Sequence, residues 1–344
     1  MTNTILITGA TGLIGFRILL AALAAGHNVR FTARSETKAR TVSANPAVQK
    51  MLTGNKDGNR LSSAIIPDLT VVGAFDTAMK GVTHVIHAGS PVPKPTYDPT
   101  TEIFQATIGI SSNILLAALK TPTVRRVVIT SSIVCNLPLG PLPPTTTPVS
   151  ACDRVPLPEP LPSSFDDVFS GYIYGKVVEM HQSDEFAKKQ QPHFTISHVV
   201  PGYVFGRNEL MLDAEMMRSQ NSSNNFMVMG MTGGELPFPI HGAFAHIDDV
   251  AETHLKVAFL ESEGPHRDFG IATKIDYGSI FDIVHKAFPK ATAAGIFKRG
   301  SVPTLPVAYD SSDVEQLLGH LRTFEDAVID VAGQYLEKLG LEKA

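Results

Sequence analysis

Tyr172 and Lys176 are the residues whose types and spacing most directly suggest chemistry in this chain. A separation of four residues places both side chains on one face of a helix. A free tyrosine titrates at about pH 10, and a neighbouring ammonium group stabilises the tyrosinate and lowers that pKa. Such a pair could therefore move a proton at neutral pH, provided that the surrounding sequence supplies a matching site. Tyr174 is the weaker candidate because the residue four positions after it is Val178.

The sequence before this pair supplies hydroxyl groups at the end of an apolar strand. The run Val127-Val-Ile-Thr-Ser-Ser132 predicts a strand over 125–131 that ends in Thr130, Ser131 and Ser132. Side chains alternate between the two faces of a strand, so only one of the two serines can face the tyrosine. A hydroxyl in that place could donate a hydrogen bond to an oxygen that gains negative charge during a reaction.

A second chemical signal opens the chain, where the apolar residues 4–7 lead into Thr8-Gly-Ala-Thr-Gly-Leu-Ile-Gly15 and then into a helical pattern. Gly9 permits a turn that a Cβ would obstruct, Gly12 lets a pyrophosphate approach the backbone, and Gly15 lets the helix pack closely. The free N–H groups at the start of the helix and the positive end of its dipole favour phosphate groups. The motif therefore predicts that the chain binds a dinucleotide.

The charge after the second predicted strand indicates which dinucleotide. Arg34 follows that strand about twenty residues past the last motif glycine, where an acidic residue would accept from the ribose 2′-hydroxyl of NAD. An arginine instead pairs with the 2′-phosphate of NADP, and Lys38, one helical turn onward, adds a second positive charge. The third strand is followed by Asp68-Leu69, where a carboxylate could accept from the adenine amino group. These residues favour NADPH.

Strand and helix signals alternate through the first two hundred residues, and this alternation predicts an α/β fold of the Rossmann type. A doubly wound parallel sheet is expected, with a smaller C-terminal substrate-binding region. Residues 1–204 are expected to form the NADP-binding domain, and residues 205–344 mainly the substrate-binding region, with some segments returning to the first domain. The predicted strands are 4–8, 28–33, 64–66, 83–88, 125–131 and 194–200, and the predicted helices are 12–25, 73–80, 101–120 and 170–188.

Two segments interrupt this rhythm. Residues 136–165 contain nine prolines, so they form neither a helix nor a central strand, and a long loop of this kind usually serves a function. Residues 211–231 contain six of the ten methionines. Methionine adapts to irregular apolar shapes, so this segment could form a substrate lid, and packing within a core is the equally weighted alternative.

Composition excludes several classes of protein. Hydrophobic residues make up 43% and charged residues 18%, which is typical of a folded globular protein. A net charge of −4 gives no electrostatic footprint for nucleic acid or an anionic membrane. We find no apolar run long enough to span a bilayer and no basic signal-peptide region at the N-terminus, and Cys135 and Cys152 read as ordinary thiols. A cytoplasmic protein is expected.

Histidines and carboxylates do not indicate a metal site. His246, Asp248 and Asp249 cluster in sequence, but no set with ligand spacing accompanies them, so we expect them to stabilise a turn and a helix N-terminus. His84 and His87 point to opposite faces of a strand and are expected to be structural.

Together these motifs resemble those of the extended short-chain dehydrogenase/reductase superfamily, also described as NAD-dependent epimerases and dehydratases. Within it, the chain is most similar to the dihydroflavonol reductase and cinnamoyl-CoA reductase group and to microbial aldehyde and ketone reductases. The resemblance covers nearly the whole chain. It rests on the glycine motif, His84-Val-Ile-His-Ala-Gly-Ser-Pro91, Thr130-Ser-Ser132, Tyr172 with Lys176, Pro201-Gly-Tyr-Val-Phe-Gly206, His246-Ile-Asp-Asp-Val-Ala251 and Tyr309-Asp-Ser-Ser312 with Leu318-Gly319.

The resemblance implies a role for each matching residue. Tyr172 is implied as the general acid, Lys176 as its partner and a ligand of the nicotinamide ribose, and Ser132 rather than Ser131 as the donor to the carbonyl oxygen. The backbone of residues 201–204 is implied to hold the nicotinamide carboxamide. The full set of implied cofactor-binding residues is Thr8, Gly9, Thr11, Gly12, Leu13, Ile14, Gly15, Arg34, Lys38, Asp68, Leu69, Ala88, Gly89, Ser90, Thr130, Tyr172, Lys176, Pro201, Gly202 and Val204.

The sequence departs from the family pattern in two places. Thr107 stands where many extended members carry asparagine, which puts a fourth catalytic residue in doubt. The segment between Ser132 and Tyr172 is longer and richer in proline than in the plant enzymes, so the plant substrates are not carried over. Cys135 lies near the expected pocket and is expected to be a small buried filler.

The sequence thus predicts an NADPH-dependent reductase that acts on an aldehyde or ketone with a sizeable apolar or aromatic body. A nucleotide-sugar epimerase or dehydratase with bound NAD is the first alternative; Arg34 argues against it, although Arg207, Arg218 and Lys298 could hold a sugar diphosphate. A non-catalytic NADP-binding regulator and a dehydrogenase running in the oxidative direction are further alternatives. The expected assembly is a monomer or a homodimer, with no nucleic acid, membrane or metal involved.

Overall fold

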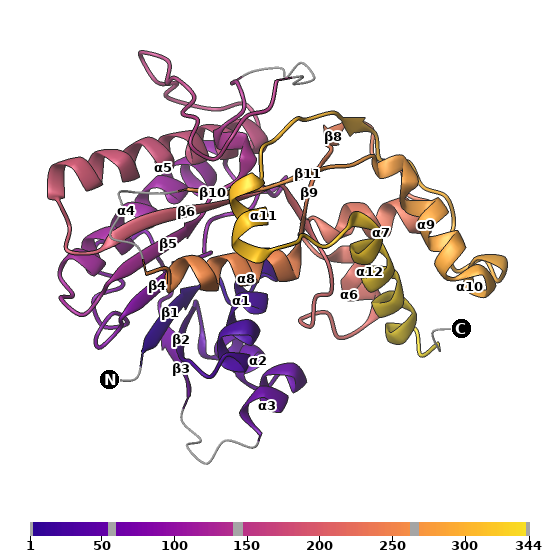
Figure 1. Cartoon of the computed structure of the whole chain (residues 1–344), viewed down its shortest axis with the longest axis horizontal. Helices are drawn as coiled ribbons and strands as arrows, with labels where there is room; N and C mark the ends of the chain where they lie inside the picture. Colours follow the sequence, from indigo (N-terminus) through magenta and orange to yellow (C-terminus); the bar gives the residue numbers. More distant parts are fainter. Residues whose placement is uncertain (1–2, 54–59, 140–146, 262–267, 342–344) are drawn as a thin grey trace. The chain divides into compact units, whose positions relative to one another are not determined.

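The computed structural model describes residues 3–53, 60–139, 147–261 and 268–341 (Figure 1). Contacts between residues divide the chain into two units, and the chain passes more than once between them. Unit 1 comprises residues 1–141, 151–200 and 251–269, and unit 2 comprises residues 142–150, 201–250 and 270–344. The sequence places the corresponding boundary between residues 204 and 205. Residues 140–146 of the proline-rich segment lie outside the described residues.

Unit 1 is built on a seven-stranded sheet with the order β10-β6-β5-β4-β1-β2-β3. The six strands from β1 to β6 pair in parallel, and the order reverses between β1 and β4, where an α/β sheet binds its ligand at the carboxyl ends of the strands. The predicted Rossmann-type fold is confirmed. The strands are β1 (Thr4–Thr8), β2 (Asn28–Ala33), β3 (Leu61–Ile65), β4 (His84–His87), β5 (Arg126–Thr130), β6 (Thr195–Pro201) and β10 (Phe269–Ile271).

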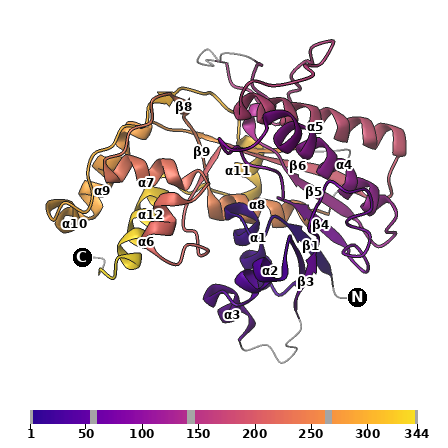
Figure 2. The same ribbon diagram turned by 180° about the vertical axis from the view of Figure 1, so that it is seen from behind.

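Helices cover both faces of this sheet (Figures 1 and 2). On one face, Ile110, Ile114 and Leu115 pack in one core cluster with Val127 and Ile129 of β5. From the other face, the guanidinium of Arg126 donates to the carbonyl of Val257 in a second helix and to that of Leu260, which follows this helix. The helices of this unit are α1 (Leu13–Ala24), α2 (Glu36–Ser43), α3 (Pro46–Leu52), the π-helix η1 (Pro99–Gln105), α4 (Ala106–Leu119), the 3-10 helix η2 (Ile133–Cys135), α5 (Val168–Gln190) and α8 (Ile247–Ala258), which begins in unit 2.

One predicted helix is wrong. Residues 73–80 form consecutive turns instead, in which Phe75, Ala78 and Met79 are buried while the residues between them are exposed. Gly73 opens this stretch with φ +79°, a backbone conformation that does not continue into a right-handed helix. The apolar spacing that suggested a helix therefore reflects burial of a turn-rich segment against the core.

Two glycines let α5 approach η1 and the start of α4 closely. A Cβ at Gly171 would lie 2.3 Å from the carbonyl oxygen of Pro99, and a Cβ at Gly175 would lie 3.3 Å from Cβ of Thr107. A distance of 2.3 Å leaves no room for a side chain, so Gly171 is required for this packing. The approach fixes the helix that carries Tyr172 and Lys176 against the segment that follows β4.

Unit 2 contains small sheets and a helical layer around an aromatic core. Phe324 packs edge to face against Phe205, Phe244 and Tyr277, with ring centroids 5.3–6.2 Å apart, and Tyr277 packs in the same way against Phe205. The strands are β7 (Tyr203–Phe205), β8 (Ile240–His241), β9 (Ala243–His246), β11 (Thr273–Lys274) and β12 (Thr304–Leu305), and the helices are α6 (Ala214–Ser219), α7 (Asn224–Thr232), the 3-10 helix η3 (Tyr277–Ser279), α9 (Ile280–Ala287), α10 (Pro289–Ala293), α11 (Ser312–Leu318) and α12 (Phe324–Lys338).

The methionine-rich segment belongs mainly to this core. Met217, Met227 and Met231 are fully buried, and Met211 and Met229 pack against them, whereas Met216 is exposed. These contacts favour core packing over a substrate lid.

The search for membrane spans corrects one expectation from the sequence. Pro99–Leu119, formed by η1 and α4 together, is long and apolar enough to cross a bilayer by length and composition, with a mean hydropathy of 1.4. This stretch does not stand out in the sequence as a continuous apolar run, because hydroxyl and amide side chains and Glu102 interrupt it. Half of its 18-residue window is buried within the protein, and it packs on the sheet, so its apolar character is that of a core helix.

The buried histidines on β4 predict that the stability of the fold decreases as the pH is lowered. Burial lowers the pKa of His84 to about 4 and that of His87 to about 3. The unfolded chain takes up these protons at about pH 6.5, so stability is complete above that pH and decreases as pH falls towards 4. We expect the free energy of unfolding in urea to drop by about 2 kcal/mol per histidine between pH 7.5 and pH 5.

His84→Gln should remove one such contribution, and the exposed His193→Gln should not. The same pH dependence in both variants would contradict this assignment.

Candidate active site

The glycine turn between β1 and α1 has the geometry of a phosphate cradle. Gly9 has φ +75°, and a Cβ there would lie 2.3 Å from the carbonyl oxygen of Ala88, so only glycine fits. A Cβ at Gly15 would lie 2.3 Å from the carbonyl oxygen of Gly9, so Gly15 packs against the turn itself. Gly12 caps α1 without a side-chain hydrogen bond, and Thr11 and Gly12 are exposed. The start of α1, with Leu13 and Ile14 half-buried, is therefore open to an anion.

Arg34 and the Asp68-Leu69 pair line one pocket of about 370 Å³ in unit 1, as the sequence leads us to expect of an adenosine site. Arg34 and Lys38 are exposed, but Lys38 is not among the pocket residues. The carboxylate of Asp68 accepts from the backbone N–H and the hydroxyl of Thr70, at 2.8 and 2.6 Å. These hydrogen bonds, with a smaller effect of Arg34, lower the pKa of Asp68, so it is an anion whose free lone pairs could still accept from an adenine.

The remaining residues that line this pocket are not predicted from the sequence. They come from the segment after β4 and from η1 and α4, and they are Pro91, Tyr97, Thr101, Glu102, Ala106 and Ile110. Asn113 supports the side of the pocket that contains Leu69, because its amide donates to the carbonyls of Leu69, Thr70 and Val71 at 2.8–3.2 Å. No residue type or spacing marks these positions, since the fold alone brings them beside Arg34.

Where β4 ends, some side chains make buried hydrogen bonds between strands and others lie half-buried at the edge of the sheet. The hydroxyl of Thr8 is fully buried and lies 2.7 Å from Nδ1 of His87, so it joins the ends of β1 and β4. Ala88, Gly89 and Ser90 are half-buried at the carboxyl edge of the sheet. Oγ of Ser90 is buried and has no hydrogen-bond partner in the described part of the chain. An unpaired hydroxyl beside the glycine turn suits a segment that contacts a polar ligand.

Ser132, rather than Ser131, lies with Tyr172. Ser131 is buried and its hydroxyl donates to Sγ of Cys135 at 3.5 Å, whereas Ser132 is half-buried and hydrogen-bonds the side chain of Tyr172. Ser132 also precedes the short helix η2 without capping it, which leaves its hydroxyl available. The alternation of the strand thus separates the two serines as expected.

Lys176 lies behind Tyr172 in a buried position at the end of β5. Its Nζ donates to the carbonyl oxygen of Thr130 at 3.0 Å and pairs with Oε2 of Glu179 at 2.8 Å. Burial by itself lowers the pKa of Lys176, but Glu179 and Tyr172 outweigh that effect and raise it, so the ammonium stays charged. The hydroxyl of Thr130 lies 2.7 Å from Nε2 of His254 and is therefore engaged on the other face of the sheet.

The pKa of Tyr172 differs from the sequence expectation. Burial raises this pKa above its ordinary value, and it outweighs the lowering effects of Lys176 and of the hydrogen bond from Ser132. Glu179 and Cys135 raise it further. Lys176 does exert the predicted influence, but Glu179 reduces it, and the tyrosine is a phenol at neutral pH. A phenol is the form that donates a proton.

Two neighbours of the pair have structural roles. Tyr174 packs against Phe165 with the two rings tilted and their centroids 5.0 Å apart, and its helix position turns it away from Lys176. Thr107 is buried and donates its hydroxyl to the carbonyl oxygen of Ile103 at 2.7 Å. That bond occupies the hydroxyl, so Thr107 does not act in place of an asparagine. Burial raises the pKa of the Cys135 thiol to about 11, in keeping with an inert buried filler.

The remaining expected residues lie in unit 2. The N–H of Gly202 donates to the carbonyl of Ile271, and a Cβ there would lie 2.4 Å from the carbonyl oxygen of Ala243, while Val204 is buried in β7. Their role, and that of Pro201, towards a carboxamide stays a prediction. Nδ1 of His246 accepts from the N–H of Asp248, and Asp249 pairs with Arg322. No group of three metal-ligating side chains occurs among the described residues.

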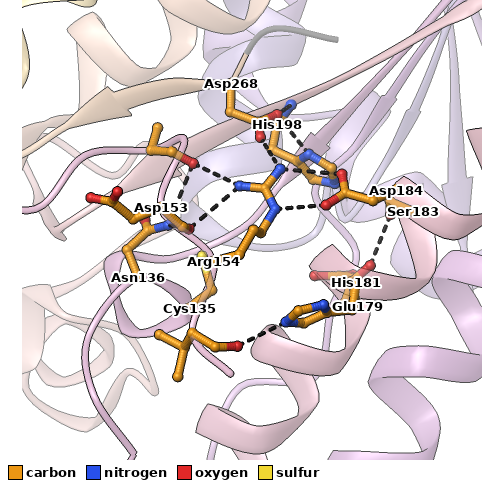
Figure 3. A network of polar contacts seen from close by, with 12 residues as sticks. Cys135, Asn136, Asp153, Arg154, Glu179, His181, Ser183, Asp184, His198 and Asp268 are labelled. Carbon is orange, nitrogen blue, oxygen red and sulfur yellow. Dashed lines mark hydrogen bonds and ion pairs between the residues drawn. The ribbon is translucent and has the colours of Figure 1, made fainter. Parts of the chain in front are cut away.

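An ion-pair network anchors the proline-rich segment to α5 (Figure 3). The guanidinium of Arg154 pairs with Asp184 of α5 at 2.7 Å and with Asp268, which precedes β10, at 2.6 Å. Burial alone would raise the pKa of Asp268, but His198 and Arg154 hold it well below its usual range. Asn136 donates to the carbonyl of Asp153, and His181 contacts that of Val155. The segment after Ser132 is thus fixed on the helix that carries Tyr172.

The fold and this group of side chains define a dinucleotide-binding α/β protein of the reductase and epimerase class. The model of the NAD dependent epimerase/dehydratase family matches residues 5–272, and the chain belongs to this family. It is 34% identical over 330 residues to NAD-dependent epimerase/dehydratase ALT6 of Alternaria alternata, with 92% of each chain covered. It is 32% identical over 347 residues to ketoreductase CTB6 of Cercospora nicotianae, with 97% of this chain and 95% of the relative covered. The predicted family is confirmed.

A solved structure supports the same fold. Yeast methylglyoxal/isovaleraldehyde reductase Gre2, complexed with NADPH, superimposes with a TM-score of 0.82 at 22% identity, covering 98% of this chain and 99% of that one. At this identity the likeness establishes the shared architecture.

The position of Arg34 predicts the choice of cofactor. Arg34→Ala should raise the dissociation constant for NADPH by about tenfold or more, because a charge-assisted pair with the 2′-phosphate is lost. The dissociation constant for NADH should change little. Quenching of the cofactor's fluorescence by the protein measures both constants. Arg40→Ala is the matched control, because Arg40 is an exposed arginine on α2, the helix that follows Arg34. Equal losses for the two cofactors in Arg34→Ala would rule out this contact.

The Arg154 network predicts a large effect on stability. Arg154→Leu should lower the free energy of unfolding by about 3 kcal/mol, because it leaves the buried Asp268 without its guanidinium partner. Asp184→Asn removes the more exposed partner of the same arginine and should cost less than about 1 kcal/mol. Urea unfolding at pH 7.5 gives both values, and equal costs would show that the buried pair is not the important one.

Proposed function

We propose that this chain is an NADPH-dependent reductase that transfers a hydride to the carbonyl carbon of an aldehyde or ketone. The observation that carries the proposal is the group formed by Ser132, Tyr172 and Lys176 at the carboxyl end of β5. Tyr172 is a half-buried phenol hydrogen-bonded to Ser132, and Lys176 is a buried ammonium behind it. This arrangement supplies a proton donor and a polarising hydroxyl for one oxygen atom.

Each side chain then has one task. Ser132 donates a hydrogen bond to the carbonyl oxygen and stabilises the negative charge that develops there. Tyr172 gives its phenolic proton to that oxygen, which completes the alcohol. Lys176 stabilises the tyrosinate that remains and would hold a ribose hydroxyl of the cofactor. Bound NADPH supplies the hydride.

The residues of unit 1 fit this cofactor. Gly9, Gly12 and the open start of α1 would hold the pyrophosphate, and Arg34 in the pocket with Leu69 would hold the adenosine and its 2′-phosphate. The unpaired hydroxyl of Ser90 would gain a partner. Residues 1–204 would thus bind the cofactor, and 205–344 would mainly bind the substrate. The similar proteins include a ketoreductase and a methylglyoxal/isovaleraldehyde reductase complexed with NADPH, which agrees with this function.

The epimerase alternative is less well supported. A nucleotide-sugar enzyme needs free cations for a diphosphate, and Arg207, Arg218 and Lys298 are the basic residues that the sequence offers. Arg207 is paired with Glu337, and Arg218 donates to the phenol of Tyr335 at 2.9 Å. A non-catalytic regulator would have no use for the Ser132, Tyr172 and Lys176 group.

The same proposal covers the setting of the enzyme. We expect a small-molecule carbonyl substrate with an apolar or aromatic body, a monomer or homodimer in the cytoplasm, and no nucleic acid or membrane partner. The net charge of −4 supports the last point. Light scattering on the purified protein would determine the assembly, and a fluorescent fusion would show its location.

Cofactor oxidation by the purified protein tests the function. NADPH and NADH are compared over a panel of aromatic aldehydes, diketones and bulky ketones. Turnover with a preference for NADPH is expected. Tight NAD retained through purification, with no turnover on the panel, would favour the epimerase. Bound NADPH without turnover would favour the regulator.

The role of Tyr172 predicts a sharp loss of activity. Tyr172→Phe should lower kcat by about 100-fold or more, because general acid catalysis is removed, while the dissociation constant for NADPH stays within about twofold. Steady-state kinetics and cofactor titration measure the two effects. Tyr174→Phe keeps the ring that packs against Phe165 and should retain activity. Unchanged turnover in Tyr172→Phe would remove this tyrosine from the mechanism.

A further inference from the structure

The pocket of unit 1 that contains Arg34 is also lined by an aromatic side chain to which the proposed function gives no role. This side chain is Tyr97, which is half-buried in the segment between β4 and η1. The proposed function assigns the pocket to the adenosine end of NADPH through Arg34, Asp68 and Leu69. Its volume of about 370 Å³ is within the range of small-molecule sites, roughly 300–1,000 Å³.

The sheet places Arg34 and Tyr97 on the two sides of the point where the strand order reverses. Arg34 follows β2 and Asp68 follows β3, whereas Tyr97 follows β4, and β1 lies between β4 and β2. Ligands of open α/β sheets bind at this point, outside the carboxyl ends of the strands. A flat group in the pocket therefore has a guanidinium from one segment and a phenol ring from the other beside it.

Local hydrogen bonds fix the segment that carries Tyr97. Its backbone N–H donates to the carbonyl oxygen of Lys94 at 3.0 Å, which closes a turn. The next residue, Asp98, caps η1 by accepting from two N–H groups of that helix at 3.1 and 2.6 Å, and its own N–H donates to Glu102 at 2.8 Å. The turn and the capped helix hold the ring in place, so a ligand that binds against it pays little for ordering the backbone.

Lys94 adds a second contact to this ring. Its ammonium lies over the ring of Tyr97, 5.2 Å from the centroid, in a cation–π interaction. Lys94 is not among the residues that line the pocket, so the ammonium does not compete with a ligand for that space. It also brings positive charge to the segment, which favours a ligand that carries phosphate groups.

An aromatic ring and a guanidinium in one pocket are groups that bind a nucleobase by stacking. Every base has a π-face that stacks on aromatic side chains, and a guanidinium stacks on the same kind of face. The other lining residues suit a flat apolar body, since Pro67, Leu69 and Ala106 expose no charge. A nucleobase therefore matches this pocket better than a sugar or a phosphate group does.

We propose that Tyr97 is a cofactor-binding residue whose ring stacks on the adenine of NADPH, with the guanidinium of Arg34 on the other side of the base. This inference rests on the proposed function and deepens it. It adds a contact from the segment after β4 to those of the glycine turn and Arg34. The ring of Tyr97, rather than its hydroxyl, makes this contact.

The first experiment uses adenosine 2′,5′-bisphosphate, which carries the adenine and the 2′-phosphate but no nicotinamide. Calorimetry measures its dissociation constant for the full chain and its variants. Tyr97→Ala should raise this constant about tenfold, because stacking is lost, whereas Tyr97→Phe keeps the ring and should stay within about twofold of the wild type. Val92→Ala is the matched control, since Val92 is 52% exposed in the same segment and does not line the pocket. Unchanged binding in Tyr97→Ala would overturn the proposal.

A second experiment reports the stacking itself. The chain has seven tyrosines and no tryptophan, so its tyrosine fluorescence can be followed directly. Saturation with the bisphosphate should quench part of the emission of the wild type, because the base contacts the phenol ring. Tyr97→Phe should bind the bisphosphate and lose this quenching. Equal quenching in the wild type and in Tyr97→Phe would overturn the proposal.

These measurements separate the stacking contact from the reductase function. Binding of the bisphosphate that depends on Tyr97, in a protein that reduces no carbonyl with NADPH, would contradict the function and support the contact. Carbonyl reduction with NADPH, together with unchanged binding of the bisphosphate in Tyr97→Ala, would contradict the contact and support the function. Failure of the wild type to bind the bisphosphate would contradict the assignment of this pocket to adenosine and would overturn the proposal with it.

Discussion

The burial of the Lys176 ammonium is the constraint on which the active-site region depends. A charge that is 2% exposed must have fixed partners, and it finds them at the carbonyl end of β5 and one turn further along its own helix. These two bonds set how α5 lies relative to the central strand. They therefore also set where Tyr172, one turn before the lysine, meets Ser132 at the end of that strand. The chemistry follows from the packing.

Glycines and an ion-pair network reinforce the same arrangement. Gly171 lets α5 come within contact of the Pro99 carbonyl, and Arg154 ties the segment after Ser132 to Asp184 further along that helix. The helix is thus held on β5, on η1 and on the proline-rich segment. A reacting group held from three directions keeps its geometry without paying for reordering at each turnover.

Much of the fold could be predicted from the sequence because its signals are local. Gly9 and Gly15 occupy places where a Cβ does not fit, and the buried strands are continuous apolar runs, so both features are visible in the residue types. The helix expected at 73–80 was wrong because the same apolar spacing served a series of turns. The apolar stretch Pro99–Leu119 is not evident in the sequence because Glu102 and several serine, threonine and amide side chains interrupt it.

Active-site residues could be predicted where a sequence motif marks them. They could not be predicted where only the fold brings them next to one another. Tyr172, Lys176 and Ser132 were marked by spacing and by resemblance. Glu179 is an ordinary acidic residue in the sequence, and only burial beside Lys176 gives it significance. The raised pKa of Tyr172 has the same origin, because burial and Glu179 together outweigh the lysine. The wall of the pocket around Tyr97 and Glu102 likewise depends on the folding of η1.

The central claim is that this chain moves a hydride from NADPH to a carbonyl carbon and releases the alcohol. The most direct test uses NADPH that carries deuterium at C4 of the nicotinamide, with the best substrate of the panel, and examines the product by mass spectrometry and NMR. The account predicts one deuterium on the carbinol carbon for each NADPH oxidised. Product without deuterium, or label that remains with a tightly held cofactor, would contradict it.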